Sequence, residues 1–490
     1  MPRLVRPARL IDWLDRSPVV LVSVGLFSIF LAFMSGHLYS IDGLQYFRVA
    51  EGIIFDRTLF FDPPLTWGVV IARPVTPIGF SLVQIPAVLL ASWARPLQPP
   101  FTAATYDWSL FYGDPVYTLS SWVNPLLVAL TGALTFRTAG HLGAPRRPAI
   151  LIAIAIVLGS PLFFYARADF AQPLATFLML GIIALLIDGF QRRRVWPGLM
   201  TGAVALAILT RQADGLMIAV VALFVLCLPL GDWRPFRDAR RLGSEVVLGV
   251  LVGMAATLVL DVIRFGSPLN FGYSPDFSGS IKWGMIGELV SPGRGLLWYF
   301  PLLALAPFGV WVLWRRGFRH EIAILVLPVI AYLPVYAKYA ALGAWDWGPR
   351  YLVPLVPLLG LLAGSVVWSQ RRWPVSVLLF GTLGIAGALA NVAHLAVNPF
   401  SFWPTYGDSV FGTPGFWRQF EFGAYAPIGM WQLYNPVSGP DIMWLHLAGS
   451  THRLSIVVFL LLLVVGIAAL VWAWKRSGLV SVILKPQGSE

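Results

Sequence analysis

Long apolar runs follow one another along this chain of 490 residues, and short polar segments separate them. A membrane-spanning helix needs about 20 consecutive apolar residues, and most of the runs have that length. The pattern predicts an all-α polytopic membrane protein with twelve spans, at residues 18–38, 119–138, 148–166, 171–189, 195–210, 213–230, 244–264, 295–314, 321–340, 350–368, 373–396 and 453–474.

The first apolar run follows four arginines, Arg3, Arg6, Arg9 and Arg16. A cleaved signal peptide would have a shorter apolar core and a cleavage site of small residues. We therefore expect the first helix to be retained.

One further run, TPIGFSLVQIPAVLLASW (76–93), is short, contains two prolines and is interrupted by Gln84. If it crossed the membrane, every later loop would change sides. If it lies in the interface, the cytoplasmic side carries 22 Lys/Arg against 8 Asp/Glu, and the outer side 13 against 15. The second topology follows the positive-inside rule. It predicts a half-inserted 76–93, cytoplasmic termini and, for a bacterial protein, a place in the inner membrane.

Composition supports a membrane protein, because 58% of the residues are hydrophobic and only 12% are charged. A soluble chain carries roughly 25% charged residues. The net charge of +12 is explained by topology, so it does not imply nucleic acid. The single cysteine, Cys227, excludes an internal disulfide. The predicted cytoplasmic loops are short and contain no Walker or Rossmann glycine motif, so we expect the chemistry on the outer face.

Two long outer segments, 39–117 and 397–452, are rich in aromatics and prolines, a composition that argues against disorder. The second has 13 aromatics in 56 residues, 23% against 14% for the whole chain. It is either a sugar-binding platform or a packed cap. The predicted organisation is a transmembrane domain over 1–396 that carries the loop 39–117, a cap over 397–452, and a last helix with its tail over 453–490.

After Asp42, the residues Leu44, Phe47, Ala50 and Ile54 recur at helical spacing. This pattern predicts a short amphipathic helix on the membrane surface. Asp42 at its start has two interpretations. It is either a helix N-cap or a base at the bilayer boundary, within reach of a hydroxyl that arrives from water.

The layout resembles the GT-C membrane glycosyltransferases, which include protein O-mannosyltransferases and the lipid A aminoarabinose transferase. The shared features are an apolar first helix, an aspartate at its outer end, an amphipathic juxtamembrane helix and a second, proline-bearing interfacial helix. Asp169, in YARADFAQPLATF (165–177), stands where that fold places another acidic residue. The resemblance extends to LVSPGRGLLWYFP (289–301) and GAWDWGPRYLVPLVP (343–357). It implies a GT-C-like fold with external juxtamembrane helices and an inverting sugar transfer.

The chain departs from that family at one position. Many members carry Asp-Glu in the first loop, whereas Asp42 is followed here by Gly43. The sequence therefore leaves open whether a divalent metal ion takes part. No other cofactor is indicated.

Arg167 and Asp169 lie two residues apart just before a span. They form either a local ion pair that closes a helix end, or a site in which Asp169 orients the acceptor or holds a metal.

Basic residues at the predicted outer ends are candidates for binding a donor phosphate, because guanidinium groups bind phosphate bidentately and remain charged. Interfacial anchoring is the competing explanation. The candidates are Arg294, Arg350 and Arg211, followed by Lys282 and Lys338.

Aromatic and acidic residues near these positions are candidates for binding the sugar or the acceptor: Tyr46, Trp345, Asp346 and Trp347. Tryptophan is also common in membrane-interface belts, which is the alternative for Trp345 and Trp347. The scattered His394, His446 and His452 have no zinc-binding spacing.

The sequence favours a glycosyltransferase that moves a sugar from a polyprenyl-phosphate donor to a glycan, lipid or protein acceptor, with Asp42 as general base. A transporter or flippase of a lipid-linked substrate is the alternative, and a non-catalytic subunit is a third. The identities of the sugar and the acceptor are not readable from the sequence.

Overall fold

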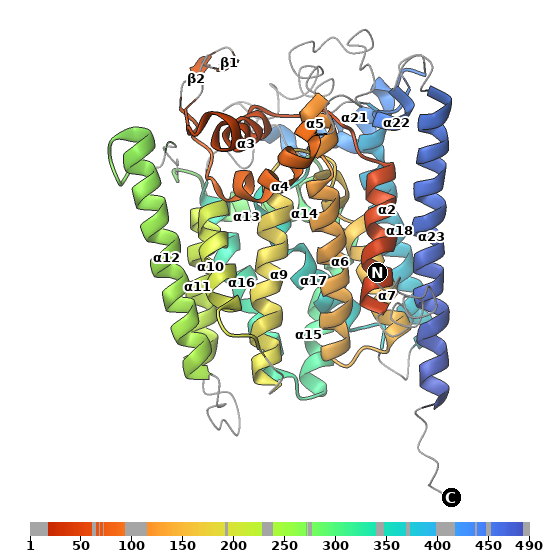
Figure 1. Ribbon diagram of the computed structural model, residues 1–490. Coiled ribbons are helices and arrows are strands. Elements are labelled where there is room, and N and C mark those ends of the chain that lie inside the picture. Colours follow the sequence, from red (N-terminus) through yellow and green to blue (C-terminus); the bar gives the residue numbers. More distant parts are fainter. Residues whose placement is uncertain are drawn as a thin grey trace, which may run out of the picture.

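The computed structural model describes residues 18–60, 65–67, 69–71, 73–93, 115–191, 195–227, 239–270, 272, 277–339, 347–368, 373–397, 417–436, 439–446 and 452–483. Long helices run side by side and form a bundle (Figure 1). They are α2 (Pro18–Ala32), α6 (Val123–His141), α7 (Arg146–Leu158), α9 (Gln172–Phe190), α10 (Leu199–Thr210), α11 (Gln212–Cys227), α12 (Ala239–Phe265), α15 (Ala306–Arg315), α16 (Arg319–Lys338), α17 (Val356–Gly364), α18 (Trp373–Val392) and α23 (His452–Ile483).

Each of the twelve predicted spans contains one of these helices. Within the described ranges, six helical stretches are long and apolar enough to cross a membrane, judged by length and composition: Val116–His141, Gln172–Phe190, Arg240–Phe265, Arg319–Lys338, Pro374–Leu395 and Arg453–Ser477. The protein is therefore an integral membrane protein, and the number of crossings stays a prediction.

Shorter helices gather across one end of the bundle, which we call the α3 end (Figure 1). They are α3 (Ile41–Glu51) with its π-helical extension (Gly52–Asp56), α4 (Gly79–Trp93), α5 (Pro115–Ser120), α21 (Ala426–Leu433) and α22 (Met443–His446). A small antiparallel hairpin of β1 (Leu65–Trp67) and β2 (Val69–Ile71) projects beside them and departs from the expected all-α architecture.

Prolines shape the helices that begin near the two arginine motifs. The predicted span 295–314 is broken into α14 (Leu296–Tyr299), a 3₁₀ turn (Pro301–Leu305) and α15, and a second 3₁₀ turn (Arg350–Leu355) precedes α17. Proline lacks an N–H donor and clashes with the preceding helical turn, so it favours a kink or a break in a helix. The chain therefore enters both helices through irregular turns, and Arg294 and Arg350 lie at these entries.

Small residues allow the closest helix contacts. A Cβ on Gly309 would lie 1.6 Å from the carbonyl oxygen of Leu362, so only glycine lets α15 approach α17 at this point. α2 and α23 meet in the same way, because a Cβ on Gly25 would lie 3.0 Å from the carbonyl oxygen of Gly466. The first and last described helices are thus neighbours.

The remaining short elements connect the bundle to the α3 end. They are α8 (Leu162–Tyr165), α13 (Ile281–Val290) and the 3₁₀ turns Ala393–Leu395, Trp417–Phe420 and Phe422–Ala424.

Candidate functional site

Asp42 and Arg350 form an ion pair at the α3 end. The N-cap of α3 is Ser40, whose Oγ accepts the backbone N–H of Gly43 at 2.9 Å. The interpretation of Asp42 as the cap is therefore wrong. Its carboxylate accepts a hydrogen bond from the Arg350 guanidinium at 2.7 Å. The two side chains are 18% and 19% exposed, so the pair is accessible at its edge.

Aromatic rings hold the Arg350 guanidinium in place. It lies over the ring of Phe170, at 4.7 Å from the centroid, and near that of Tyr351, at 5.8 Å. Gly348 lies two residues before Arg350 with a φ of +67°, and a Cβ there would meet the ring of Tyr299 at 3.1 Å. Only glycine adopts this left-handed conformation without strain, so Gly348 makes the turn that delivers Arg350 to Asp42.

Arg211 is a second cation beside Arg350. It lies between α10 and α11 and pairs with Asp214 at 2.9 Å. Its guanidinium lies 5.1 Å from the ring centroid of Tyr351. The same aromatic ring therefore contacts both arginines, and cation–π attraction favours both positions.

Asp169 is a buried carboxylate next to the start of α3. It accepts the backbone N–H groups of Tyr39, at 2.9 Å, and Ser40, at 3.2 Å. Of the two alternatives for Arg167 and Asp169, the local ion pair is wrong, because the Arg167 guanidinium pairs with Asp441 instead. Burial raises the pKa of Asp169 to about 7, although these hydrogen bonds oppose the rise.

Gly43 packs directly against Asp169. A Cβ at position 43 would lie 1.4 Å from Oδ2 of that carboxylate, far closer than two non-bonded atoms can approach. Many GT-C proteins have glutamate at this point of the first loop, but here the Asp169 carboxylate occupies the space. The Asp-Gly departure in the sequence thus has a steric explanation.

Tyr46 connects these groups. It lies in α3, is buried, and meets the ring of Phe80 edge-on at 5.2 Å. Burial raises the pKa of its phenol above the ordinary range, and four charged groups act on the same phenol: Asp42, Arg350, Arg211 and Asp169. The structure therefore brings together two carboxylates and two guanidinium groups from four separate parts of the sequence.

Sequence reasoning missed a buried cluster around Asp441. Its carboxylate accepts hydrogen bonds from Tyr39 Oη at 2.5 Å, from His37 Nε2 at 2.7 Å and from the Arg167 guanidinium at 3.1 Å. Burial alone would raise the pKa of Asp441, but the neighbouring His37 and Arg167 hold it well below its usual range. Asp441 is one of two aspartates in the aromatic segment 397–452, and nothing in the sequence distinguished it as the partner of His37 and Arg167.

Arg294 lies in another group, around Gln419 and Tyr299. Its backbone N–H donates to Ser291 Oγ at 3.3 Å, and its side chain is buried. The neighbouring Gly293 donates to the carbonyl of Gln419 at 2.8 Å and accepts from Tyr299 Oη at 3.0 Å.

The remaining candidates lie in diverse places. Lys282 and Lys338 are exposed. Trp347 is fully buried; its ring stacks on Phe164, and its Nε1 donates to Asn391 at 2.8 Å. It therefore supports the site from within the core, unlike a residue of an interfacial belt. Trp345 and Asp346 lie outside the described residues.

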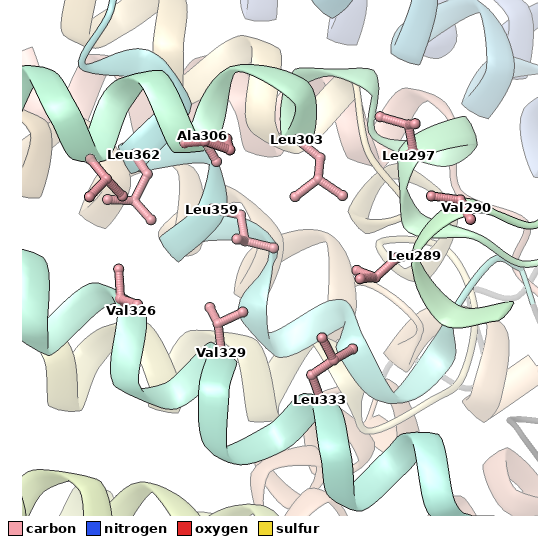
Figure 2. A pocket seen from close by; sticks show the side chains of 12 residues that line it. Leu289, Val290, Leu297, Leu303, Ala306, Val326, Val329, Leu333, Leu359 and Leu362 are labelled. Carbon is pink, nitrogen blue, oxygen red and sulfur yellow. The ribbon is translucent and has the colours of Figure 1, made fainter. Parts of the chain in front are cut away.

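A cavity of about 420 Å³ opens beside α13 and extends between α15, α16 and α17 (Figure 2). Its walls are apolar throughout. They are formed by Leu289, Val290, Leu297, Leu303, Ala306, Pro307, Val310, Val326, Val329, Leu333, Leu359 and Leu362. Such a dry surface suits a hydrocarbon ligand. Leu289 and Val290 line one end of the cavity, and in the sequence they directly precede the loop that contains Arg294.

The carboxylates do not assemble a metal site. Among the described residues, no three His, Cys, Asp or Glu side chains come together in a way that could hold a metal ion. Asp169 directs both oxygens at N–H donors, and Asp42 faces a guanidinium. These groups do not fit a divalent cation, and we derive no step through one.

Comparison with known proteins gives a likeness at the level of structure. Neither a protein-family model nor a curated protein sequence matches the chain. The solved structure of ArnT from Cupriavidus metallidurans in the apo state matches with a TM-score of 0.50 at 18% identity, covering 96% of this chain and 78% of that chain. ArnT bound to undecaprenyl phosphate gives a TM-score of 0.49 at 17% identity, with the same coverage. The apo match shows a shared fold: the chain has the fold of the lipid A aminoarabinose transferase ArnT, the GT-C fold that the sequence resemblance predicts.

Proposed function

We propose that this protein is a glycosyltransferase that takes a sugar from a polyprenyl-phosphate donor and passes it to a hydroxyl of an acceptor on the outer face of the membrane. The observation that carries the proposal is the Asp42–Arg350 pair, at the edge of a charged group on the α3 end. It offers a carboxylate that can take a proton beside a cation that can bind phosphate.

The pair suggests how donor binding prepares the base. In the structure, the Arg350 guanidinium donates to Asp42 and neutralises its charge. A phosphate group that binds Arg350 and Arg211 competes with Asp42 for the Arg350 guanidinium, because guanidinium groups make charge-assisted, bidentate contacts to phosphate. Asp42 is then released toward the acceptor hydroxyl. The base thus becomes available when the donor is in place.

The transfer is a single displacement. The acceptor oxygen forms a bond to the anomeric carbon as the bond from that carbon to the phosphate oxygen breaks, and the hydroxyl proton passes to Asp42. The leaving group is the polyprenyl phosphate. Arg350 and Arg211 stabilise the charge that develops on it, as preorganised cations do in transition states. One displacement inverts the configuration at the anomeric carbon.

The other candidate residues have supporting roles in this proposal. Asp169 holds the chain at the start of α3 through its backbone contacts, and Tyr46 lies among the charged groups. The apolar cavity offers a place for part of a polyprenyl chain. Arg294, Lys282 and Lys338 are further candidate cations for its phosphate. The α3 end faces outward because the opposite topology would place the basic clusters outside.

The experiment is the substitution Asp42→Asn in purified protein, assayed with undecaprenyl-phosphate-linked radiolabelled sugars and cell-envelope acceptor fractions. Loss of general-base assistance lowers a rate by roughly 10²–10⁴, so we expect a fall of that size with donor binding retained. Asp188→Asn is the control, because Asp188 is also a carboxylate paired with an arginine but lies near the C-terminal end of α9.

Equal transfer by the wild-type and Asp42→Asn proteins would rule out Asp42 as the base. If neither protein transfers sugar but both move the lipid-linked sugar across vesicles, the protein is a transporter.

A further inference from the structure

The segment of residues 417–446, described over 417–436 and 439–446, contacts two separate parts of the α3 end. Near its start, Gln419 accepts the backbone N–H of Gly293, next to Arg294. Near its end, Asp441 contacts the chain that leads from α2 to α3. We call this segment the late segment.

Asp441 binds the chain before α3 through two side chains. His37 uses Nε2 on the carboxylate of Asp441, while Nδ1 lies 3.1 Å from the carbonyl oxygen of Leu38. The hydroxyl of Tyr39 contacts the other carboxylate oxygen. Both residues are at least 95% buried. These contacts join parts of the chain that are 404 and 402 residues apart.

Arg167 fixes the same carboxylate from a third direction. Its guanidinium donates to the side chain and to the backbone carbonyl of Asp441, and to the carbonyl of His394 at 3.1 Å. Arg167 is two residues before Asp169. The Asp441 carboxylate therefore anchors both the segment that contains Asp169 and the segment before α3 whose backbone N–H groups bind Asp169.

Further contacts keep the late segment against the end of α2. The backbone N–H of Met443 donates to the carbonyl of Met34 at 2.9 Å, and Trp444 Nε1 donates to the carbonyl of Leu31 at 2.8 Å. These carbonyls lie at or just beyond the C-terminus of α2, where helical partners are missing. Asp441 therefore lies in an interface between the late segment and the end of α2 that several hydrogen bonds hold together.

The anchored chain determines where Asp42 lies. Tyr39 and Ser40 give their backbone N–H groups to Asp169, and Ser40 also caps α3. Asp42 is in the first turn of that helix, two residues after the cap. A shift of residues 37–40 therefore moves the start of α3 and, with it, the carboxylate that faces Arg350.

We propose that Asp441 is a positioning residue for the transfer reaction: by holding His37, Tyr39 and Arg167 in one buried cluster, it sets the place of Asp42 relative to Asp169 and Arg350. This inference rests on the proposed function for its catalytic consequence. The anchoring itself does not depend on which reaction the protein performs.

The test combines hydrogen exchange with kinetics on the full-length protein in detergent or nanodiscs. In Asp441→Asn, we expect the amides of residues 37–43 to exchange at least tenfold faster, while those of α9 keep their rates. With an undecaprenyl-phosphate-linked sugar as donor, kcat should fall about 10- to 100-fold and KM for the donor should change less than threefold. Asp188→Asn, the matched control, should leave the 37–43 amides unchanged.

A milder variant covers the case in which Asp441→Asn does not fold. Tyr39→Phe removes one hydrogen bond to Asp441 and keeps the ring, so it should fold, speed exchange of the same amides and lower kcat about three- to tenfold. Unchanged exchange of residues 37–43 in the folded variants overturns the proposal. If exchange rises but wild-type protein transfers no sugar, the anchoring stands, and the proposed function together with the positioning role fails.

Discussion

Two buried clusters in this protein use the same chemistry. Asp188, near the C-terminal end of α9, accepts from Arg137 and lies 2.8 Å from His141 Nδ1. Asp441, at the α3 end, accepts from Arg167 and His37. Each consists of an aspartate between one arginine and one histidine, so a buried ion pair by itself does not identify a functional site.

The two clusters differ in what surrounds them. Arg137 and Asp188 join two adjacent helix ends that are 51 residues apart, whereas Asp441 joins chain segments about 400 residues apart. Beside Asp441 lie a second buried carboxylate, held by backbone N–H groups, and the partly exposed Asp42–Arg350 pair. The comparison shows that the α3 end is distinguished by an accessible ion pair beside a buried cluster.

The largest effect is expected from Gly43→Ala. The added methyl group would overlap the Asp169 carboxylate, so α3 must shift away and carry Asp42 with it. We expect sugar transfer to fall more than 100-fold. Gly181→Ala in α9 is the control, because a Cβ there meets nothing within 4 Å, and it should retain full activity in the same assay. Full activity of Gly43→Ala would show that the fit between α3 and Asp169 is unimportant.

A smaller effect is expected from Arg350→Lys. Lysine keeps the charge but loses the planar fork that can serve a carboxylate and a phosphate. The value of kcat/KM for the lipid-linked donor should fall about 10- to 50-fold. Arg315→Lys, at the end of α15 away from the α3 end, provides a matched change and should fall less than twofold. If kcat/KM fell by a similar factor in both variants, the arginine at the α3 end would be no more important for the donor than the arginine at the end of α15.

The pH dependence of stability separates Asp169 from Asp441. Burial raises the pKa of Asp169 from its ordinary 3.8 to about 7. The folded protein then retains a proton that the unfolded chain releases, so this group makes the protein less stable as pH rises from about 4 to 7. The loss is on the order of 2–4 kcal/mol. In Asp169→Asn, the midpoint temperature of unfolding should therefore fall less between pH 4 and pH 7 than it does in the wild-type protein.

Asp441 should behave in the opposite way. Its lowered pKa means that its contribution to stability is present above pH 4 and is lost as the pH falls further. If Asp441→Asn changed the same pH 4–7 window as Asp169→Asn, the assignment of the two carboxylates would be wrong.

The smallest effect on activity is expected from Asp188→Asn. Removing one partner of a buried pair destabilises a protein, but the Arg137 side chain is 40% exposed and water can compensate it. We expect a loss of about 1–2 kcal/mol in unfolding free energy and transfer within twofold of wild type. A tenfold loss of transfer would connect this cluster to the reaction.

The bundle could be predicted from sequence because apolar length alone identifies helices in a membrane. All twelve predicted spans contain a helix, and the 3₁₀ turns at Pro301 and Pro354 come from prolines that were readable in the sequence. The faces of α3 were harder to predict. Gln45 lies between the apolar positions of the helical pattern, yet it is buried and accepts the backbone N–H of Val75 from a loop 30 residues further along the chain.

Part of the site could also be predicted. Asp42, Asp169, Arg211 and Arg350 attract attention because charges are rare at the ends of apolar spans, and all four act on Tyr46. The cluster of Asp441, His37 and Tyr39 could not be found in this way. Its members belong to loops whose pairing depends on the three-dimensional path of the chain, and neither spacing nor periodicity reports it.

The contact between Asp441 and His37 has a consequence for biosynthesis. His37 emerges from the ribosome early, but its partner follows 404 residues later. Until then, the chain ahead of α3 has only some of its native contacts, and most of the bundle has already been inserted. The α3 end is therefore among the last parts of the molecule to mature, so a nascent chain that is released before residue 441 has most helices of the bundle but lacks the contacts of Asp441.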